Sequence, residues 1–180
     1  MKNANRIRKS WTFLALLTLC LPIFISSRLA AQSSQPAADT YTWSGELVSL
    51  DEGARILTVK ARVVGDQPIT ELPKFKAGDR ILLTWSGYDK YADAINHVIR
   101  YDATKKTEER FTFPADFVAF DSAHQYVTFK APVPADSIAK IKSLKPGEWV
   151  TATSPHTKTA EAQPIVSVRP YVWSSSTNSN

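Results

Sequence analysis

The sequence contains almost no sulfur and little glycine, and each shortage excludes a class of site. Its only cysteine, Cys20, and its only methionine, Met1, lie before Gln32, and its six glycines are scattered. The chain from Gln32 onward therefore has no disulfide and no soft sulfur ligand for Cu(I). It also lacks a glycine-rich phosphate-binding loop. We expect a fold that is stabilised by packing alone and that carries no cofactor.

The N-terminal segment 1–31 has the composition of an export signal. An apolar run over 11–25 is too short for an ordinary membrane span, and small residues follow it up to Ala31. Before the run lies a basic start made of Lys2, Arg6, Arg8 and Lys9. We predict a signal peptide over 1–31 and a periplasmic or secreted protein. The alternative is an uncleaved N-terminal membrane anchor.

The formal net charge of +5 comes from this N-terminal segment. Five of the 22 lysines and arginines lie before Gln32, and no acidic residue precedes Asp39. The remainder therefore has 17 cations against 17 acidic residues. Binding to nucleic acid requires a positive surface that displaces counterions from phosphate. We expect no nucleic-acid partner, and membrane contact only through an uncleaved N-terminal segment.

Two stretches of the central chain are similar to each other without a gap, at a constant offset that matches Tyr41 to Phe111. Seven of the 23 positions in 41–63 are identical to those in 111–133, where chance would give about one or two. We therefore predict a duplicated unit, with repeat 1 over 41–105 and repeat 2 over 106–173. The flanking segments 32–40 and 174–180 are polar, and we expect a disordered linker and a disordered tail.

Both predicted repeats show the same series of local patterns. A long strand ends at a turn that begins with Asp51 or Asp121, since aspartate readily bonds the backbone of a turn. A strand of alternating apolar and polar residues follows, then a short helix and a Lys-x-Gly-acid step at 76–79 and 145–148. Two more strands complete each unit. The expected strands are 41–50, 57–63, 80–85 and 94–101, then 111–120, 127–133, 149–153 and 164–172; the helices are expected near 70–75 and after a cap at Asp136 or Ser137.

This order of elements resembles small Greek-key barrels of the oligonucleotide/oligosaccharide-binding (OB) type. The pattern G-x-[LV]-x-x-[LF]-D…T-[VF]-K…L-K-x-G-[DE]-x-[VI] is also similar to repeats in poorly characterised exported bacterial proteins, although Ala115 replaces Gly45 in repeat 2. The resemblance implies an all-β fold with one or two short helices. Two arrangements stay open: tandem OB-like barrels, or one pseudo-symmetric barrel that strands of both repeats close together.

The sequence shows no constellation that is typical of catalysis or of metal binding. His97, His124 and His156 have no second ligand at metal-binding spacing. No G-x-S-x-G sequence is present to hold an activated serine. We therefore expect neither a metal site nor an enzyme. The alternative is a small cell-wall glycan hydrolase that uses carboxylates of turns, such as Asp51 with Glu52.

The connection after the third strand of repeat 1 is the best candidate for ligand binding. It combines aromatic rings with carboxylates, which suits a sugar or glycan because rings offer apolar area and acids accept hydroxyl donors. The predicted site residues are Trp85, Tyr88, Asp89, Tyr91 and Asp93. The alternative is that these rings lie in the core, in which case the glycan interpretation fails.

These observations together predict an exported, non-enzymatic binding or scaffold protein of the cell envelope. Its expected partner is an envelope protein or a glycan. The sequence does not indicate an oligomeric state.

Overall fold

A computed structural model describes residues 39–86, 94–104, 111–156 and 164–172. They all belong to one unit, Gln35–Asn180. The predicted fold class is confirmed, because the described elements are mostly strands with two short α-helices. The first half contains β1 (Thr40–Asp51), β2 (Ile56–Val63), α1 (Asp66–Glu71), the 3-10 turn η1 (Leu72–Lys74), β3 (Arg80–Trp85) and β4 (Ala94–Arg100). The second half contains β5 (Thr112–Asp121), β6 (Tyr126–Pro132), α2 (Ala135–Ile141), β7 (Trp149–Pro155) and β8 (Ser167–Pro170).

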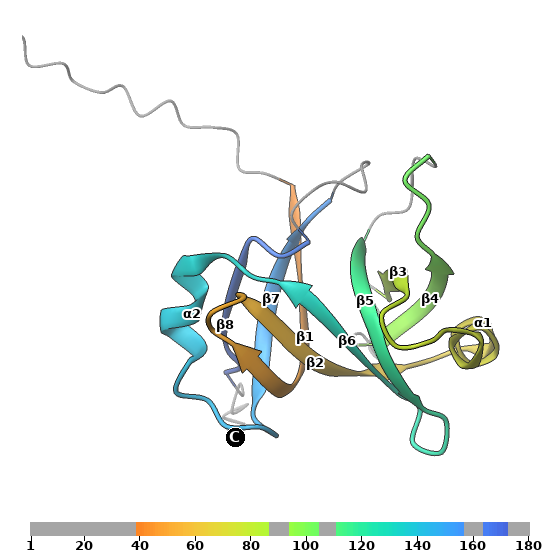
Figure 1. Cartoon of the computed structure of the whole chain (residues 1–180), viewed down its shortest axis with the longest axis horizontal. Coiled ribbons are helices and arrows are strands. Elements are labelled where there is room, and N and C mark those ends of the chain that lie inside the picture. Colours follow the sequence, from red (N-terminus) through yellow and green to blue (C-terminus); the bar gives the residue numbers. More distant parts are fainter. Residues whose placement is uncertain (1–38, 87–93, 105–110, 157–163, 173–180) are drawn as a thin grey trace, which may run out of the picture. The chain divides into compact units, whose positions relative to one another are not determined.

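The strands of the two halves form one eight-stranded sheet in the order β4-β3-β5-β6-β2-β1-β7-β8 (Figure 1). A further, parallel pairing of β4 with β2 joins Arg62 to Ala94 and Val63 to Ile95. This pairing closes a five-stranded barrel from β4, β3, β5, β6 and β2, which β1, β7 and β8 extend. Of the two arrangements that the sequence left open, the structure therefore has a single barrel with strands from both halves.

The constant offset that relates the two halves in sequence also relates their strand pairings. Glu46 lies opposite Lys60 between β1 and β2, and Asp116 lies opposite Lys130 between β5 and β6. The halves also exchange strands, since β1 pairs with β7 and β5 pairs with β3. At the centre, Val59 of β2 lies opposite its own counterpart, Phe129 of β6. The pairings of the halves thus follow an approximate twofold relation.

Proline explains why only one side of the sheet closes. At the closed seam, the backbone N–H of Val64 donates to the carbonyl of Ile95 at 2.9 Å. In the second half, the counterpart of Val64 at the same offset is Pro134. Because proline has no backbone N–H, Pro134 cannot supply the bond that Val64 supplies at the first seam. Among the described strands, β6 and β8 accordingly do not pair.

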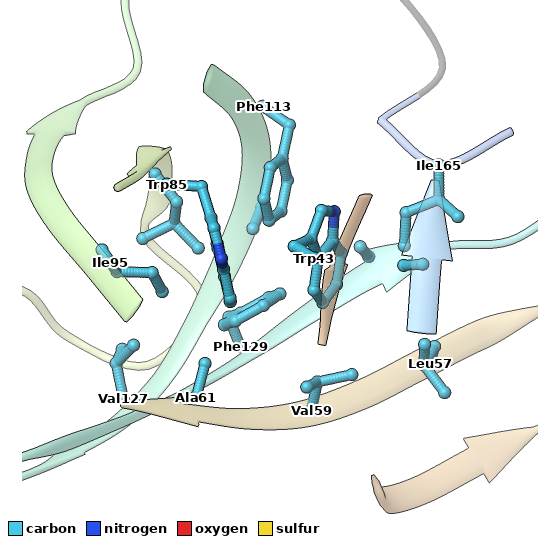
Figure 2. Packing of buried hydrophobic residues seen from close by; sticks show 14 of the residues in the cluster. Trp43, Leu57, Val59, Ala61, Trp85, Ile95, Phe113, Val127, Phe129 and Ile165 are labelled. Atoms are coloured by element: carbon cyan, nitrogen blue, oxygen red, sulfur yellow. The ribbon is translucent and has the colours of Figure 1, made fainter. Parts of the chain in front are cut away.

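The core is centred on four aromatic rings that come from four strands. The rings of Trp43 and Phe113, which are equivalent positions, stack with centroids 5.0 Å apart and planes at 5°. Trp85 lies 5.0 Å from Trp43, and Phe129 lies 5.6 Å from Phe113. Figure 2 shows these rings gathered over β2. Since the rings come from both halves, a single core stabilises the whole sheet.

Each α-helix covers one outer edge of the sheet. The side-chain amide of Gln67 on α1 donates to the carbonyl of Val98 at 2.7 Å and accepts from its N–H at 2.9 Å. On α2, the hydroxyl of Ser137 accepts from the N–H of Val168 at 3.0 Å. The part of β4 beyond its short pairing with β2, and the edge strand β8, thus find partners for backbone groups that would otherwise stay unpaired.

The helix boundaries differ from the sequence prediction. The single turn expected over 70–75 is present as η1, and α1 precedes it from Asp66. Pro68 falls in the first turn of α1, where no intrahelical bond needs the missing N–H. The predicted cap of α2 is wrong, since no side chain caps this helix and Pro134 precedes it. The hydroxyl of Ser137 bonds to β8 instead.

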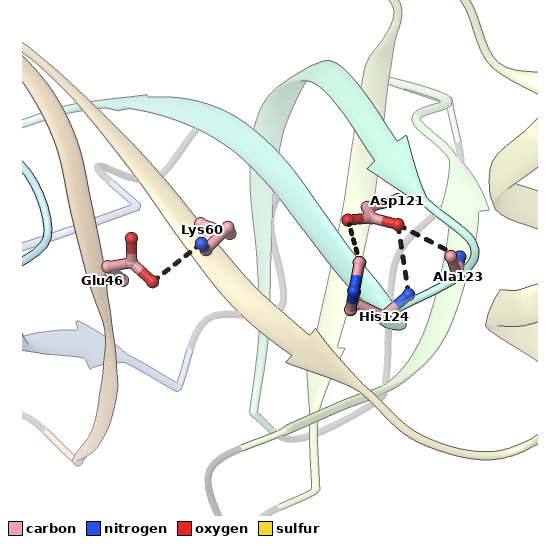
Figure 3. Close-up of polar contacts among 5 residues, drawn as sticks. All are labelled: Glu46, Lys60, Asp121, Ala123 and His124. Carbon is pink, nitrogen blue, oxygen red and sulfur yellow. Dashed lines mark hydrogen bonds and ion pairs between the residues drawn. The ribbon is translucent and has the colours of Figure 1, made fainter.

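The predicted turns are confirmed in both hairpins. The carboxylate of Asp51 accepts the N–H of Ala54 at 2.8 Å, and that of Asp121 accepts two backbone N–H groups at 3.1 Å (Figure 3). The Lys-x-Gly-acid steps also turn the chain as expected, because Gly78 and Gly147 have φ values of 91° and 93°. A residue with a side chain adopts such positive φ values only with strain.

Candidate functional site

The structure places Trp85 in the core. Its ring is 2% exposed and lies against Trp43, with Phe113 6.4 Å away. A ring that is covered in this way cannot form an exposed stacking surface for a sugar. The expectation for this residue is therefore corrected. The other predicted site residues, Tyr88, Asp89, Tyr91 and Asp93, lie outside the described residues.

Two histidines of the described chain, His124 and His156, lie in contacts with neighbouring side chains and backbone. His124 sits beside Asp121 in the second hairpin turn, with a ring nitrogen 2.8 Å from its carboxylate, and this contact lowers the pKa of Asp121. His156 follows β7, and its Nδ1 accepts the N–H of Phe111 at 3.4 Å. Within the described ranges, no three His, Cys, Asp or Glu side chains form a group that could hold a metal ion. No helix in these ranges is long and apolar enough to cross a membrane.

An aromatic cluster surrounds His156 at the end of β1 and β7. The imidazole stacks on Tyr41 at 4.8 Å and meets Phe111 edge-on at 4.7 Å, while Asp39 lies 3.8 Å from its Nε2. Burial raises the pKa of Tyr41 well above its ordinary value, and the hydroxyl of Ser154 offsets part of this effect. The imidazole thus packs between the rings of Tyr41 and Phe111, with its Nδ1 bonded to the backbone of Phe111.

A hollow of about 440 Å³ opens at the other end of β7, where the chain leaves α2 and re-enters the sheet. Its volume falls within the range of about 300–1,000 Å³ that is typical of ligand pockets. Two half-buried rings, Trp149 and Tyr171, meet here edge-to-face with centroids 6.1 Å apart. The lining residues among those described are Leu144, Gly147, Glu148, Trp149, Pro170 and Tyr171. We refer to this feature as the Trp149 hollow.

Backbone bonds hold the wall of the Trp149 hollow against β1. The N–H of Gly147 donates to the carbonyl of Leu47, and the N–H of Leu47 donates to the carbonyl of Glu148, both at 2.8 Å. The carboxylate of Glu148 in turn accepts the N–H of Lys145, which closes the Lys-x-Gly-acid turn. No cation among the described residues forms an ion pair with Glu148. The hollow therefore presents a carboxylate without a counter-charge from the described chain, on a fixed backbone.

Two arginine side chains lie at the equivalent place in the first half. Arg100 donates to the carboxylate of Asp79 at 3.1 Å, and its guanidinium lies 5.1 Å from the ring of Phe75. Arg80 pairs with a carboxylate of β5 at 2.8 Å, and its guanidinium lies 5.9 Å from the ring of Tyr101. The hydrogen bond from Arg100, together with the N–H of Lys76, lowers the pKa of Asp79.

The two halves keep the acid and the tyrosine at this place but differ in the cations. Glu148 and Tyr171 correspond to Asp79 and Tyr101, whereas Trp149 replaces Arg80. Strand pairing also identifies the counterpart of Arg100: it lies opposite Ile81, and Pro170 lies opposite Val150 in the same register. Arg100 therefore corresponds to Pro170 and not to Arg169. The exchange of Arg80 for Trp149 beside an otherwise matched motif is the signal that could have located the Trp149 hollow from sequence.

Comparison of the chain with protein-family models, with curated proteins and with solved structures gave no significant match. The resemblance to repeats of exported bacterial proteins therefore stays a prediction.

Proposed function

We propose that this protein is exported and acts in the cell envelope as a non-enzymatic binding or scaffold module. The observation that carries the proposal is the Trp149 hollow, which is lined by two aromatic rings and a carboxylate. At the equivalent place in the first half, the chain's own arginines contact the rings. Aromatic side chains beside a few fixed polar groups are typical of binding sites.

The proposal extends to the origin of the two halves. The common offset of the halves in sequence and in strand pairing supports a duplicated unit. Both halves keep the turn aspartates and the Lys-x-Gly-acid steps, which are needed for folding. The set around the Trp149 hollow is one place where the halves differ and where a cavity opens, so binding is assigned to it.

Binding is favoured over glycan hydrolysis by the number of carboxylates at the hollow. Glycoside hydrolysis requires two carboxyl groups about 5–9.5 Å apart across the scissile bond. Among the described residues that line the Trp149 hollow, Glu148 is the only acid. Asp51, a turn carboxylate that a hydrolase would need, instead holds the first hairpin through the N–H of Ala54.

Export is tested by producing the full chain in a bacterium and measuring its location and mass. We expect the protein outside the inner membrane, with the intact mass of a chain whose first residue is Gln32, because small residues up to Ala31 follow the apolar run. A full-length product in the membrane fraction would instead support the uncleaved anchor. A cytosolic product of full mass would refute export.

Binding is tested by cross-linking the exported protein in the envelope and comparing it with Trp149→Arg, a variant that fills the hollow as Arg80 does in the first half. We expect a partner that is captured by the wild type and lost in Trp149→Arg. Glu71→Gln, a change on α1 away from the hollow, should leave capture unchanged. Capture that is equal in all three proteins would refute a role for the Trp149 hollow.

A further inference from the structure

The first half shows which chemical group suits this type of site. There, guanidinium groups lie over the rings of Phe75 and Tyr101, and one of them pairs with Asp79. A guanidinium is planar and weakly hydrated, so it can stack on an aromatic face and bond a carboxylate at the same time. The second half keeps the acid and the tyrosine and lacks both arginines.

We propose, on the basis of the proposed function, that the Trp149 hollow binds an arginine side chain of a partner protein. Glu148 pairs with the guanidinium, and the rings of Trp149 and Tyr171 contact its face and its aliphatic stem. The partner thereby supplies the cation that Arg80 and Arg100 supply within the first half. Charge complementarity supports this occupant, since the carboxylate of Glu148 has no cationic partner among the described residues.

A protein cation fits these observations better than a neutral glycan does. A neutral sugar could stack on the rings and donate a hydroxyl to Glu148, but it would leave the negative charge of the carboxylate without a counter-charge. An arginine uses both features. A lysine would use the charge but would stack less well, because its ammonium is compact and strongly hydrated. We therefore expect the order arginine, then lysine, then neutral sugar.

The experiment is an NMR titration of the protein in the processed form that an expressing bacterium yields. The probes are N-acetyl-arginine amide, N-acetyl-lysine amide and chitobiose, each added to uniformly ¹⁵N-labelled protein. We expect the arginine probe to shift the backbone signals of Gly147 and Glu148 and the indole signal of Trp149. Lysine should bind at least about threefold more weakly, and chitobiose should leave these signals unchanged.

Two variants and a matched control separate the charge from the shape of the site. Glu148→Gln keeps an oxygen that accepts the N–H of Lys145, so the turn is retained, and it should weaken arginine binding about three- to tenfold. The matched change Asp79→Asn in the first half should leave binding unaltered. Trp149→Arg should abolish the shifts while the rest of the spectrum shows a folded protein.

Equal arginine affinity in Glu148→Gln and the wild type would overturn the proposal, as would shifts caused by chitobiose alone. These results can be told apart from a failure of the proposed function. If the envelope partner is still captured in a manner that depends on Trp149, the hollow binds something other than arginine. If that capture is also absent, both proposals fail.

Discussion

Replacing Gly45 with alanine tests how closely β1 and β2 approach each other. A Cβ at this position would lie 2.3 Å from Cγ1 of Val59 and 3.2 Å from the carbonyl oxygen of Lys60. Valine is short and branched, so it cannot swing aside as a longer side chain would. The strands or the valine must therefore shift, and we expect Gly45→Ala to cost about 1–3 kcal/mol of the free energy of unfolding.

The partner substitution Val59→Ala removes the atom that causes the overlap. On its own it deletes two methyl groups from a fully buried side chain, which costs about 2–3 kcal/mol through lost burial and the cavity that remains. Since the new Cβ of Gly45→Ala would then occupy part of this space, the double variant should cost little more than Val59→Ala alone. The coupling between the two changes should reach about 1–3 kcal/mol.

Urea unfolding at 25 °C, followed by the fluorescence of the buried Trp43 and Trp85, measures each free energy. Ala115→Gly serves as the control, because Ala115 on β5 is the counterpart of Gly45 on β1. It lies opposite Ile81 of β3, in the other half. It should cost only about 1 kcal/mol for the greater freedom of glycine and the lost methyl group. Additive costs of Gly45→Ala and Val59→Ala, with coupling below about 0.5 kcal/mol, would refute the close approach.

Three other predictions follow from single contacts. Because burial raises the pKa of Tyr41, folding favours its protonated form. The free energy of unfolding of the wild type, relative to Tyr41→Phe, should therefore fall above about pH 10 by up to about 1.4 kcal/mol per pH unit. Urea unfolding at several pH values measures this difference. Gln67→Leu leaves the N–H and carbonyl of Val98 without their partner, so we expect a loss of about 2–4 kcal/mol and faster amide exchange at Val98; unchanged exchange there would contradict the role of α1 as an edge cover. Gly78→Ala forces a side chain into a φ of 91° and should cost about 1–2 kcal/mol in thermal or urea unfolding, whereas an unaltered midpoint would mean that the turn adapts.

The sequence was informative wherever structure depends on neighbouring residues. Alternation predicted the strands, and Asp51 and Asp121 predicted the hairpin turns, because both signals act within a few residues. The glycines of the Lys-x-Gly-acid steps were equally readable, since their positive φ is a local requirement.

Features that depend on distant partners could not be read in this way. Equivalent strands of the two halves have the same alternation of apolar and polar residues, whether they pair within a half or between halves. The pairing of β1 with β7 and of β5 with β3 was therefore not predictable. The sequence around Trp85 does not indicate whether its ring is exposed in a loop or buried in the core, because burial depends on distant neighbours. The Trp149 hollow depends on the absence of arginines from a place that only the fold defines.

The exchange of strands between the halves has a consequence for the order in which the chain can fold. The indole of Trp43 on β1 donates to the hydroxyl of Ser154 on β7, 111 residues later. Because β1 is synthesised first and β7 nearly last, the first strand has to wait for almost the whole domain before its outer edge is paired. Such long-range pairing is typical of slowly folding β-proteins. Neither half can complete its sheet alone, so a chain that is truncated before β7 should expose β1 as a free edge and aggregate.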